Sequence, residues 1–181
     1  MYSGIVLPLS GLDPPRAGPA DRAMTPSRQV CQCLDGEHRA HLELLGRVEQ
    51  ALVRGASADV ALLAASLVHH LQHEIGRHFD FEETQLFPRM AEAGDGDLAM
   101  LLTEEHDSIR AVADELMPLA RAASAAPLTA AGSATLKRLM LELVERQVAH
   151  IQKESMALLP LLDDLLDDET DRQLAFDYAA A

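Results

Sequence analysis

The chain is poor in aromatic and basic residues, and each shortage excludes a class of protein. It has no tryptophan, aromatic residues make up 3% of its 181 residues, and its hydrophobic content is 48%, with many alanines and leucines. This composition favours packed helices over a β-sandwich or β-barrel. Only 15 basic residues stand against 29 acidic ones, which gives a net charge of −14. Such a surface repels phosphate backbones and anionic lipid, so we expect neither nucleic acid nor a membrane as a partner.

Cysteines and long hydrophobic runs are also scarce. Cys31 and Cys33 are too few for a disulfide framework, and two residues apart on a predicted helix they point in different directions. No apolar run approaches the roughly 20 residues that a helix needs to cross a bilayer. The N-terminus lacks the cationic region of a signal peptide. We therefore expect a soluble, cytoplasmic protein from a reducing compartment.

The length fits a single domain with flanking segments. Residues 1–24 hold four prolines and no helical period, which predicts a disordered leader and suggests Met24 as the native start. Residues 25–161 are predicted to form an antiparallel, up-down four-helix bundle, so the fold class is all-α. Residues 162–181 are predicted to be an acidic, helical C-terminal tail. The acidic run within that tail is interpreted as a solvated helix face.

Apolar periodicity and loop signals predict four long helices, at about Ser27–Arg54, Ala58–Ala93, Asp97–Ala123 and Thr129–Leu159. Thr25 and Pro26 resemble a helix opening, and Pro88 is expected to bend or end the second helix. At 100° per residue, Gln85 falls on the inward face of the second helix, and Ala157 and Leu161 fall on that of the fourth.

One short pattern occurs twice. A histidine is followed four residues later by a glutamate and ten residues later by a proline, at His78, Glu82 and Pro88 and again at His150, Glu154 and Pro160. Each copy has a single histidine roughly forty residues upstream, preceded by an acid, in Glu37-His38 and Glu105-His106. Positions i and i+4 of a helix share a face, so imidazole and carboxylate can reach a common point. The sequence therefore predicts two similar helical hairpins, each with one copy of the pattern.

The two repeated glutamates, Glu82 and Glu154, fall on faces that otherwise point into the core. An unpaired buried charge costs several kcal/mol, and no lysine or arginine recurs beside both of them. A pair of metal ions about 3.5–4 Å apart, bridged by the carboxylates and capped by the histidines, would supply the missing positive charge. Imidazole-rich ligation suits Fe, Zn, Cu or Ni better than Mg or Ca. A single His-x-x-x-Glu is usually an exposed ion pair. The interpretation as a metal site therefore rests on the second copy of the pattern.

The segments EHRAHLELL, HFDFEETQLFP, EEHDSIR and HIQKESMALLP resemble the hemerythrin-like, or HHE cation-binding, family. The resemblance implies a four-helix bundle with a non-haem di-iron centre, two iron ions joined by an oxo or hydroxo bridge, that reacts with dioxygen. Zinc and manganese are the alternatives to iron. The resemblance assigns terminal ligation to His38, His78, His106 and His150 and bridging to Glu82 and Glu154. Oxygen-carrying hemerythrins have five histidines and two carboxylates, so this chain would leave its metals more open.

Four neighbouring residues are candidates for supporting roles. His41 is interpreted as a core or supporting histidine in preference to a seventh ligand. Glu74, one turn before His78, is a candidate to orient a ligand imidazole. Gln85 and Gln147 are weaker candidates of the same kind. Cys31 is either a redox thiol or, as we prefer, a small buried hydrophobe.

Three functions fit these observations. The first is a di-iron protein that binds or senses dioxygen or redox state, or handles iron. The second is an enzyme of oxidative or nitrosative stress that consumes peroxide or nitric oxide, or repairs iron centres. The third is a structural helical module that binds zinc or no metal. The sequence leaves open whether the protein is an enzyme and whether it has a protein partner, and it indicates a small molecule as the ligand.

Overall fold

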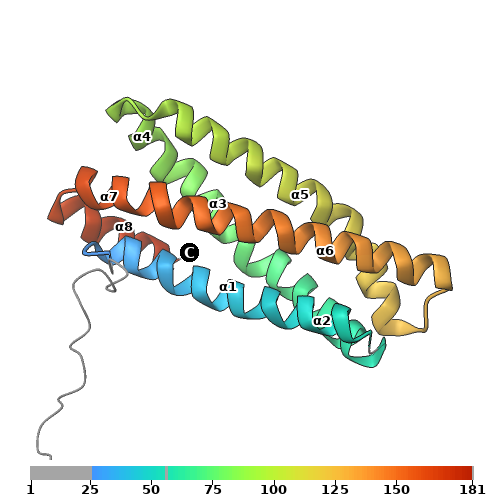
Figure 1. The fold of residues 1–181 in the computed structure, drawn as a ribbon. Coiled ribbons are helices and arrows are strands. Elements are labelled where there is room, and N and C mark those ends of the chain that lie inside the picture. The colour runs from blue at the N-terminus through green and yellow to red at the C-terminus, as the bar shows by residue number, and fades with distance from the viewer. Residues whose placement is uncertain (1–25, 56, 181) are drawn as a thin grey trace, which may run out of the picture.

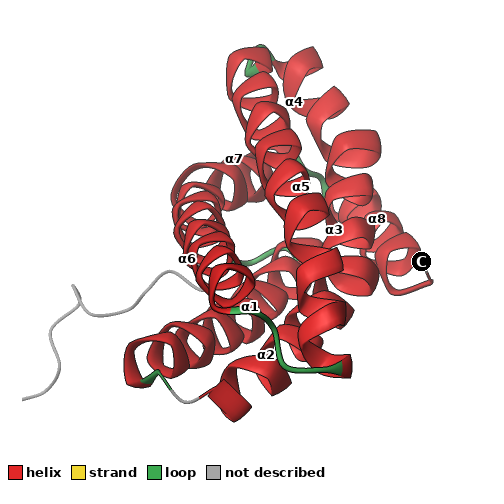
Figure 2. Cartoon of the chain, turned by 90° about the vertical axis from the view of Figure 1, so that its right-hand side faces the viewer, coloured by secondary structure: helices red, strands yellow, loops and turns green. Residues whose placement is uncertain are grey.

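The computed structural model describes residues 26–55 and 57–180, and within these ranges all side chains except those of residues 57–61, 73 and 74. The predicted leader at 1–24, the suggested start at Met24 and Thr25 lie outside the described residues. Every element of the described ranges is a helix, and they contain no strand (Figure 2). The prediction of an all-helical protein is confirmed. No helix among the described residues is long and apolar enough to span a membrane.

By continuity along the chain, most of the helices of the described residues group into four rods. These rods lie side by side (Figures 1 and 2). The first is α1 (Gln29–Arg54), and the third is α5 (Gly96–Ala125). The second consists of α2 (Ser57–His70), the π-helical turn η1 (Leu71–Ile75), α3 (Gly76–Phe81), the π-turn η2 (Glu82–Leu86) and α4 (Phe87–Ala93). The fourth consists of α6 (Ala130–Lys153), the π-turn η3 (Glu154–Leu158) and α7 (Leu159–Leu165). A separate helix, α8 (Asp168–Ala180), packs against α1.

The rods begin and end close to the predicted positions, and glycines end two of them. Gly55 (φ 71°) and Gly94 (φ 104°) adopt the left-handed conformation that closes a helix C-terminus. The rod α1 contacts α2 and α6, and α5 contacts the same two helices from the other side. Histidines and glutamates from all four rods can therefore meet in the middle.

Each repeated glutamate begins a widened helical turn. The N–H of Phe87 bonds to the carbonyl of Glu82, five residues back, and the N–H of Leu159 bonds in the same way to Glu154. A proline follows directly in both copies, and its missing N–H and bulky ring disfavour the normal four-residue spacing. The helix continues through Pro88 as α4, so of the two effects expected of this proline, a bend or a helix end, the helix end does not occur. Such π-turns are frequent at functional sites.

The widened turns shift the buried face by one residue. Leu86 is fully buried where Gln85 was predicted to point inward, and Gln85 is only half-buried. In the second copy Leu158 and Leu162 are buried in place of the predicted Ala157 and Leu161. The π-turn contains one residue more than the corresponding α-helical turn. Every later side chain is therefore rotated by about 100° around the helix axis from the direction that 3.6 residues per turn predicts.

The acidic tail caps the first helix. Asp163 accepts hydrogen bonds at 2.8 Å from the backbone N–H groups of the two residues that precede α1. Asp171 accepts bonds at 2.9 and 3.0 Å from the first two N–H groups of α1 itself. These groups would otherwise lack partners at a helix N-terminus. The interpretation of the acidic run as a solvated face is therefore wrong for these two carboxylates, and the predicted opening at Pro26 is wrong because α1 begins at Gln29.

Asp171→Ala is expected to destabilise the protein by about 1–2 kcal/mol, the usual cost of losing a helix cap whose donors stay buried. Urea unfolding followed by circular dichroism measures this change. Asp164→Ala is the matched control, because Asp164 belongs to the same acidic run but is exposed, and we expect it to change stability by less than about 0.5 kcal/mol. Equal effects of the two substitutions would contradict the capping role.

Two apolar clusters fill the space between the rods. One is centred on Val48, Leu67, Leu116 and Leu143, and the other on Leu34, Leu86, Leu102 and Leu158. Phe79, Ile109 and Ile151 of the first cluster and Phe81 and Leu102 of the second lie within a turn or so of the repeated histidines and glutamates in sequence. The polar residues of the repeats thus lie between two apolar regions, where little water screens their charges.

Candidate metal centre

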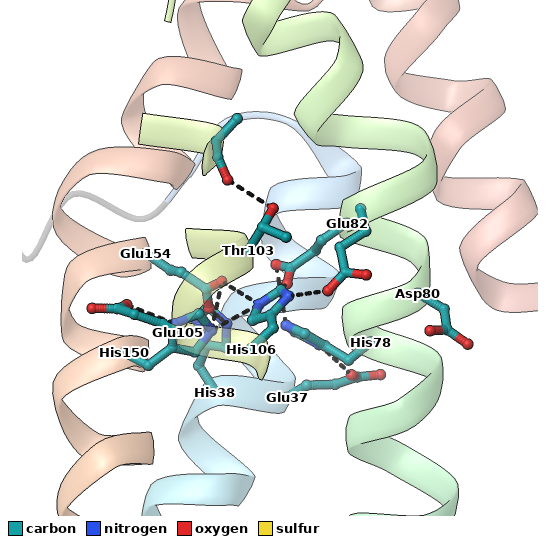
Figure 3. A network of polar contacts seen from close by, with 12 residues as sticks. Glu37, His38, His78, Asp80, Glu82, Thr103, Glu105, His106, His150 and Glu154 are labelled. Atoms are coloured by element: carbon teal, nitrogen blue, oxygen red, sulfur yellow. Dashed lines mark hydrogen bonds and ion pairs between the residues drawn. The ribbon is translucent and has the colours of Figure 1, made fainter. Parts of the chain in front are cut away.

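The structure brings the six predicted ligands together in the middle of the bundle (Figure 3). They come from all four rods and are each at most 2% exposed: His38, His78, Glu82, His106, His150 and Glu154. Helical spacing explains each half of the cluster, since His78 and Glu82, like His150 and Glu154, are one turn apart. Packing of the rods joins the halves.

The six residues form two overlapping groups of four. His38 and His78 form one group with both glutamates, and His106 and His150 form the other with the same two glutamates. Within each group, one nitrogen or oxygen from every residue lies within 4.8 Å of all the others. The glutamates are therefore shared, and each pair of histidines belongs to one group alone.

Each shared carboxylate divides its two oxygens between the groups. Oε1 of Glu82 lies 3.2 Å from Nε2 of His78, and its Oε2 lies 3.4 Å from Nε2 of His106. Oε2 of Glu154 lies 3.0 Å from Nε2 of His38, and its Oε1 lies 3.0 Å from Nε2 of His150. A carboxylate placed in this way can bridge two cations, with one oxygen on each.

These short distances are not hydrogen bonds. Both oxygens of Glu82 and of Glu154, and Nε2 of His38, have no hydrogen-bond partner of acceptable angle among the described residues. Buried polar atoms without partners are costly and rare in folded proteins. Nε2 of His106 and Nε2 of His150 lie 3.1 Å apart, and the carboxylate oxygens face the same space, as ligands around an ion do. A pair of cations therefore fits this donor set.

Carboxylates hold the outward nitrogens of three ligand histidines. Nδ1 of His78 lies 3.0 Å from Oε2 of Glu37, and Nδ1 of His150 lies 3.0 Å from Oε2 of Glu105. Nδ1 of His106 lies 2.7 Å from Glu83. Such partners keep the proton on Nδ1 and leave Nε2 free to bind a metal. The fourth histidine, His38, has only a long contact of 3.5 Å with the hydroxyl of Ser155.

A cation neutralises each of these three carboxylates. Arg77 pairs with Glu37, Arg110 with Glu83 at 2.7 Å, and Lys153 with Glu105. Burial alone would raise the pKa of Glu37, but hydrogen bonds from His78, Tyr178 and Arg77 lower it to about 2. Glu37 therefore stays ionised at any physiological pH.

In the metal-free protein, protons take the place of the cations. Burial favours the neutral form of His78, but the charge of Glu82 and the contact with Glu37 raise its pKa to about 10. Contacts with Glu154 and Glu82 likewise overcome burial and raise the pKa of His106 to about 9. Burial opposes ionisation of Glu154, but the imidazoles around it hold its pKa well below the ordinary range. His78 and His106 therefore hold protons in the metal-free protein, and a bound metal would have to displace protons from the site.

A small cavity opens on one side of the cluster. Its volume is about 10 Å³, close to the space of one water molecule. Its lining includes four of the clustered residues, His38, His78, His150 and Glu154, together with His41 and Gln147. Nε2 of His41 and both side-chain polar atoms of Gln147 are buried without a hydrogen-bond partner among the described residues. Burial and the neighbouring histidines lower the pKa of His41 to about 3, so its imidazole is neutral.

The predicted supporting residues thus have different positions. His41 and Gln147 line the cavity beside the ligands. Gln85 lies in a separate surface groove with Arg77 and Thr84, because the π-turn rotates it outward. The side chain of Glu74 lies outside the described part of the structure, and Glu37 occupies the role that we expected of Glu74, the orientation of His78.

Sequence reasoning missed the four residues that hold the outward nitrogens of His78, His106 and His150: Glu37, Glu83, Glu105 and Tyr178. A signal was present for the first three, because an acid precedes each single histidine and Glu83 follows Glu82. No signal marked Tyr178, which α8 carries to within 3.0 Å of Nδ1 of His78.

The two cysteines are free thiols in different surroundings. Cys31 is fully buried, and burial, together with the charges of Asp163 and Asp171, raises its pKa to about 12, whereas Cys33 is exposed. We expect a thiol reagent at pH 8 to label Cys33 of the native protein and to leave Cys31 unmodified, because the reactive thiolate of Cys31 does not form there. Mass spectrometry counts the labels. Labelling of a folded Cys33→Ser variant would contradict this expectation and favour a redox role for Cys31.

Comparison with known proteins is consistent with this geometry. Among curated proteins, no significant match to the chain is found. The family model of the hemerythrin HHE cation-binding domain matches residues 32–162, which contain all six clustered residues. Since this match covers well over half of the sequence, the chain belongs to the hemerythrin HHE cation-binding domain family.

Proposed function

We propose that this protein holds two metal ions, one at His38 and His78 and the other at His106 and His150, bridged by Glu82 and Glu154. The single observation that carries the proposal is that each glutamate offers one oxygen to each pair of histidines. We also propose that the four rods form an antiparallel, up-down bundle, which is supported by their short connections and by the contacts of α1 and α5 with α2 and α6.

We assign iron to the site because its four imidazoles and two carboxylates suit iron better than magnesium or calcium. A bound iron pair would supply electrons to dioxygen or a related small oxidant. The chain itself excludes bulk water, since the six ligands are at most 2% exposed. Its carboxylates Glu37, Glu83 and Glu105 keep the ligand imidazoles in the tautomer that a metal requires.

The cavity indicates where a small molecule binds. It is lined by His38, His78 and His150, so a small molecule such as dioxygen, peroxide or nitric oxide can approach ligands of both histidine pairs there. His41 and Gln147 present unpartnered polar atoms there and can hold such a molecule by hydrogen bonds. This arrangement supports a role in binding or sensing dioxygen or redox state.

Metal analysis with absorption spectra in air and after addition of dithionite tests the proposal. Two iron ions per chain and a visible band in air that dithionite removes are expected. Protein purified from iron-supplied cells that contains no iron, or whose spectrum does not respond to dithionite, would overturn it. Zinc at full occupancy would favour a structural module.

Consumption of peroxide or nitric oxide is a second candidate, and the polar lining of the cavity favours it. Hydrogen bonds from His41 and Gln147 suit a ligand that both donates and accepts, as peroxide does. Stopped-flow mixing of the reduced, iron-loaded protein with excess peroxide and a reductant separates the two functions. A single binding event supports sensing, and repeated consumption supports an enzyme.

A further inference from the structure

The C-terminal helix α8 lies outside the family match, which ends at residue 162, yet it reaches the cluster. Its residue Tyr178 is 3% exposed, and its hydroxyl lies 3.0 Å from Nδ1 of His78. The same hydroxyl donates a hydrogen bond to Oε2 of Glu37. Docking of α8 on α1, beside the N-terminal half of that helix, brings Tyr178 to this position (Figure 1).

Arg77 contacts both Tyr178 and Glu37. Its guanidinium pairs with Glu37, donates at 3.1 Å to the backbone carbonyl of Tyr178 and lies 4.4 Å from the centre of the tyrosine ring. The ring also packs on Phe81 at 4.6 Å between centres. The hydroxyl is therefore fixed in place by contacts of the ring and backbone that do not involve the hydroxyl itself.

Glu37 consequently accepts from three groups: the Nδ1–H of His78, the hydroxyl of Tyr178 and the guanidinium of Arg77. Each additional donor stabilises the negative charge on the carboxylate and weakens its pull on the remaining protons. A less basic Glu37 leaves the Nδ1 proton firmly on His78, so that this imidazole donates less electron density through Nε2.

The second copy of the repeat has a different arrangement around its carboxylate. The carboxylate that faces His150 is Glu105, and its charged partner is the half-exposed Lys153. No tyrosine hydroxyl contacts Glu105 in the described part of the chain. The surroundings of His78 and His150 are thus unequal, because only the carboxylate beside His78 accepts a hydrogen bond from a tyrosine among the described residues.

We propose that Tyr178 is a positioning residue of the metal centre. Its hydroxyl lowers the basicity of Glu37 and thereby sets how strongly Nε2 of His78 donates electrons to a metal. The proposal rests on the proposed function, because it concerns a metal bound at His78. It gives α8 a role in the site and predicts that a metal held by His38 and His78 has a higher reduction potential than the same ligands would give without the hydroxyl.

Tyr178→Phe tests the proposal in the full-length, iron-loaded protein. The phenylalanine ring keeps the contacts with Phe81 and Arg77 and removes only the hydroxyl. We expect unchanged iron content and a reduction potential that falls relative to wild type in a spectroelectrochemical titration. An unchanged potential would overturn the proposal.

Two further variants separate this role from simple packing. Leu174→Val loosens α8 at a buried aliphatic side chain, which cannot hydrogen-bond to Glu37 or His78, so it should lower the melting temperature and leave the potential unchanged. In a Glu37→Gln background, Tyr178→Phe should have little further effect, because the hydroxyl acts through that carboxylate. A shift in potential that is as large in the Glu37→Gln background as in the wild type would contradict the proposed route.

Cobalt(II) separates failure of this proposal from failure of the proposed function. If the wild-type protein binds no iron, the function is wrong, but Co²⁺ still reports on His78 through its visible absorption bands. Tyr178→Phe should then shift these bands, and Leu174→Val should not. Identical Co²⁺ spectra for wild type and Tyr178→Phe would overturn the role of the tyrosine, whatever metal the protein holds in the cell.

Discussion

Alanine in place of Glu154 is expected to abolish binding of the metal pair. The two oxygens of Glu154 lie 3.0 Å from Nε2 of His38 and 3.0 Å from Nε2 of His150, so the substitution removes one ligand from each ion at once. Loss of a partner outside the ligand shell alone weakens metal binding by about 10–100-fold, and loss of a shared ligand should exceed that. Metal analysis after dialysis against a weak chelator measures the effect.

The matched control is Glu145→Ala, which removes an exposed glutamate from α6 and should leave the metal content unchanged. Circular dichroism establishes that both variants fold. Glu82→Ala should reproduce the loss, since Glu82 makes the equivalent contacts from η2. Full metal content in a folded Glu154→Ala protein would show that this carboxylate does not bridge two ions.

Removing the metals from the wild-type protein is expected to lower its melting temperature by roughly 8–16 °C. A ligand bound only by the folded state, present at about 1,000 times its dissociation constant, contributes about 4 kcal/mol, and each kcal/mol shifts the midpoint of a domain of this size by about 2–4 °C. The metal-free protein must bury Glu82, Glu154 and four imidazoles between two apolar clusters. Differential scanning calorimetry with and without chelator measures the shift.

Glu154→Ala serves here as the chelator control, because a protein that cannot hold the pair should melt at the same temperature with and without chelator. Restoring Fe²⁺ under anaerobic conditions should restore the wild-type midpoint. A wild-type melting temperature that changes with neither chelator nor metal would contradict stabilisation by bound metal and favour a purely structural helical module.

The two largest errors of sequence reasoning share one cause. Counting at 100° per residue placed Gln85 and Ala157 inside, whereas the π-turns that begin at Glu82 and Glu154 turn Leu86 and Leu158 inward. An extra residue in one turn rotates everything after it, and periodicity alone contains no sign of the extra residue. The proline ten residues after each histidine was that sign, and its effect is a wider turn instead of a helix end.

Local sequence determined the six clustered residues and the all-helical fold, because helix periodicity and i, i+4 spacing depend only on neighbours along the chain. Tertiary structure decided what surrounds that cluster. Tyr178 reaches His78 across 100 residues, and Asp171 caps Val30 across 141. Contacts at such separations depend on how whole helices dock, and the docking energy is spread over many apolar contacts that no short pattern records.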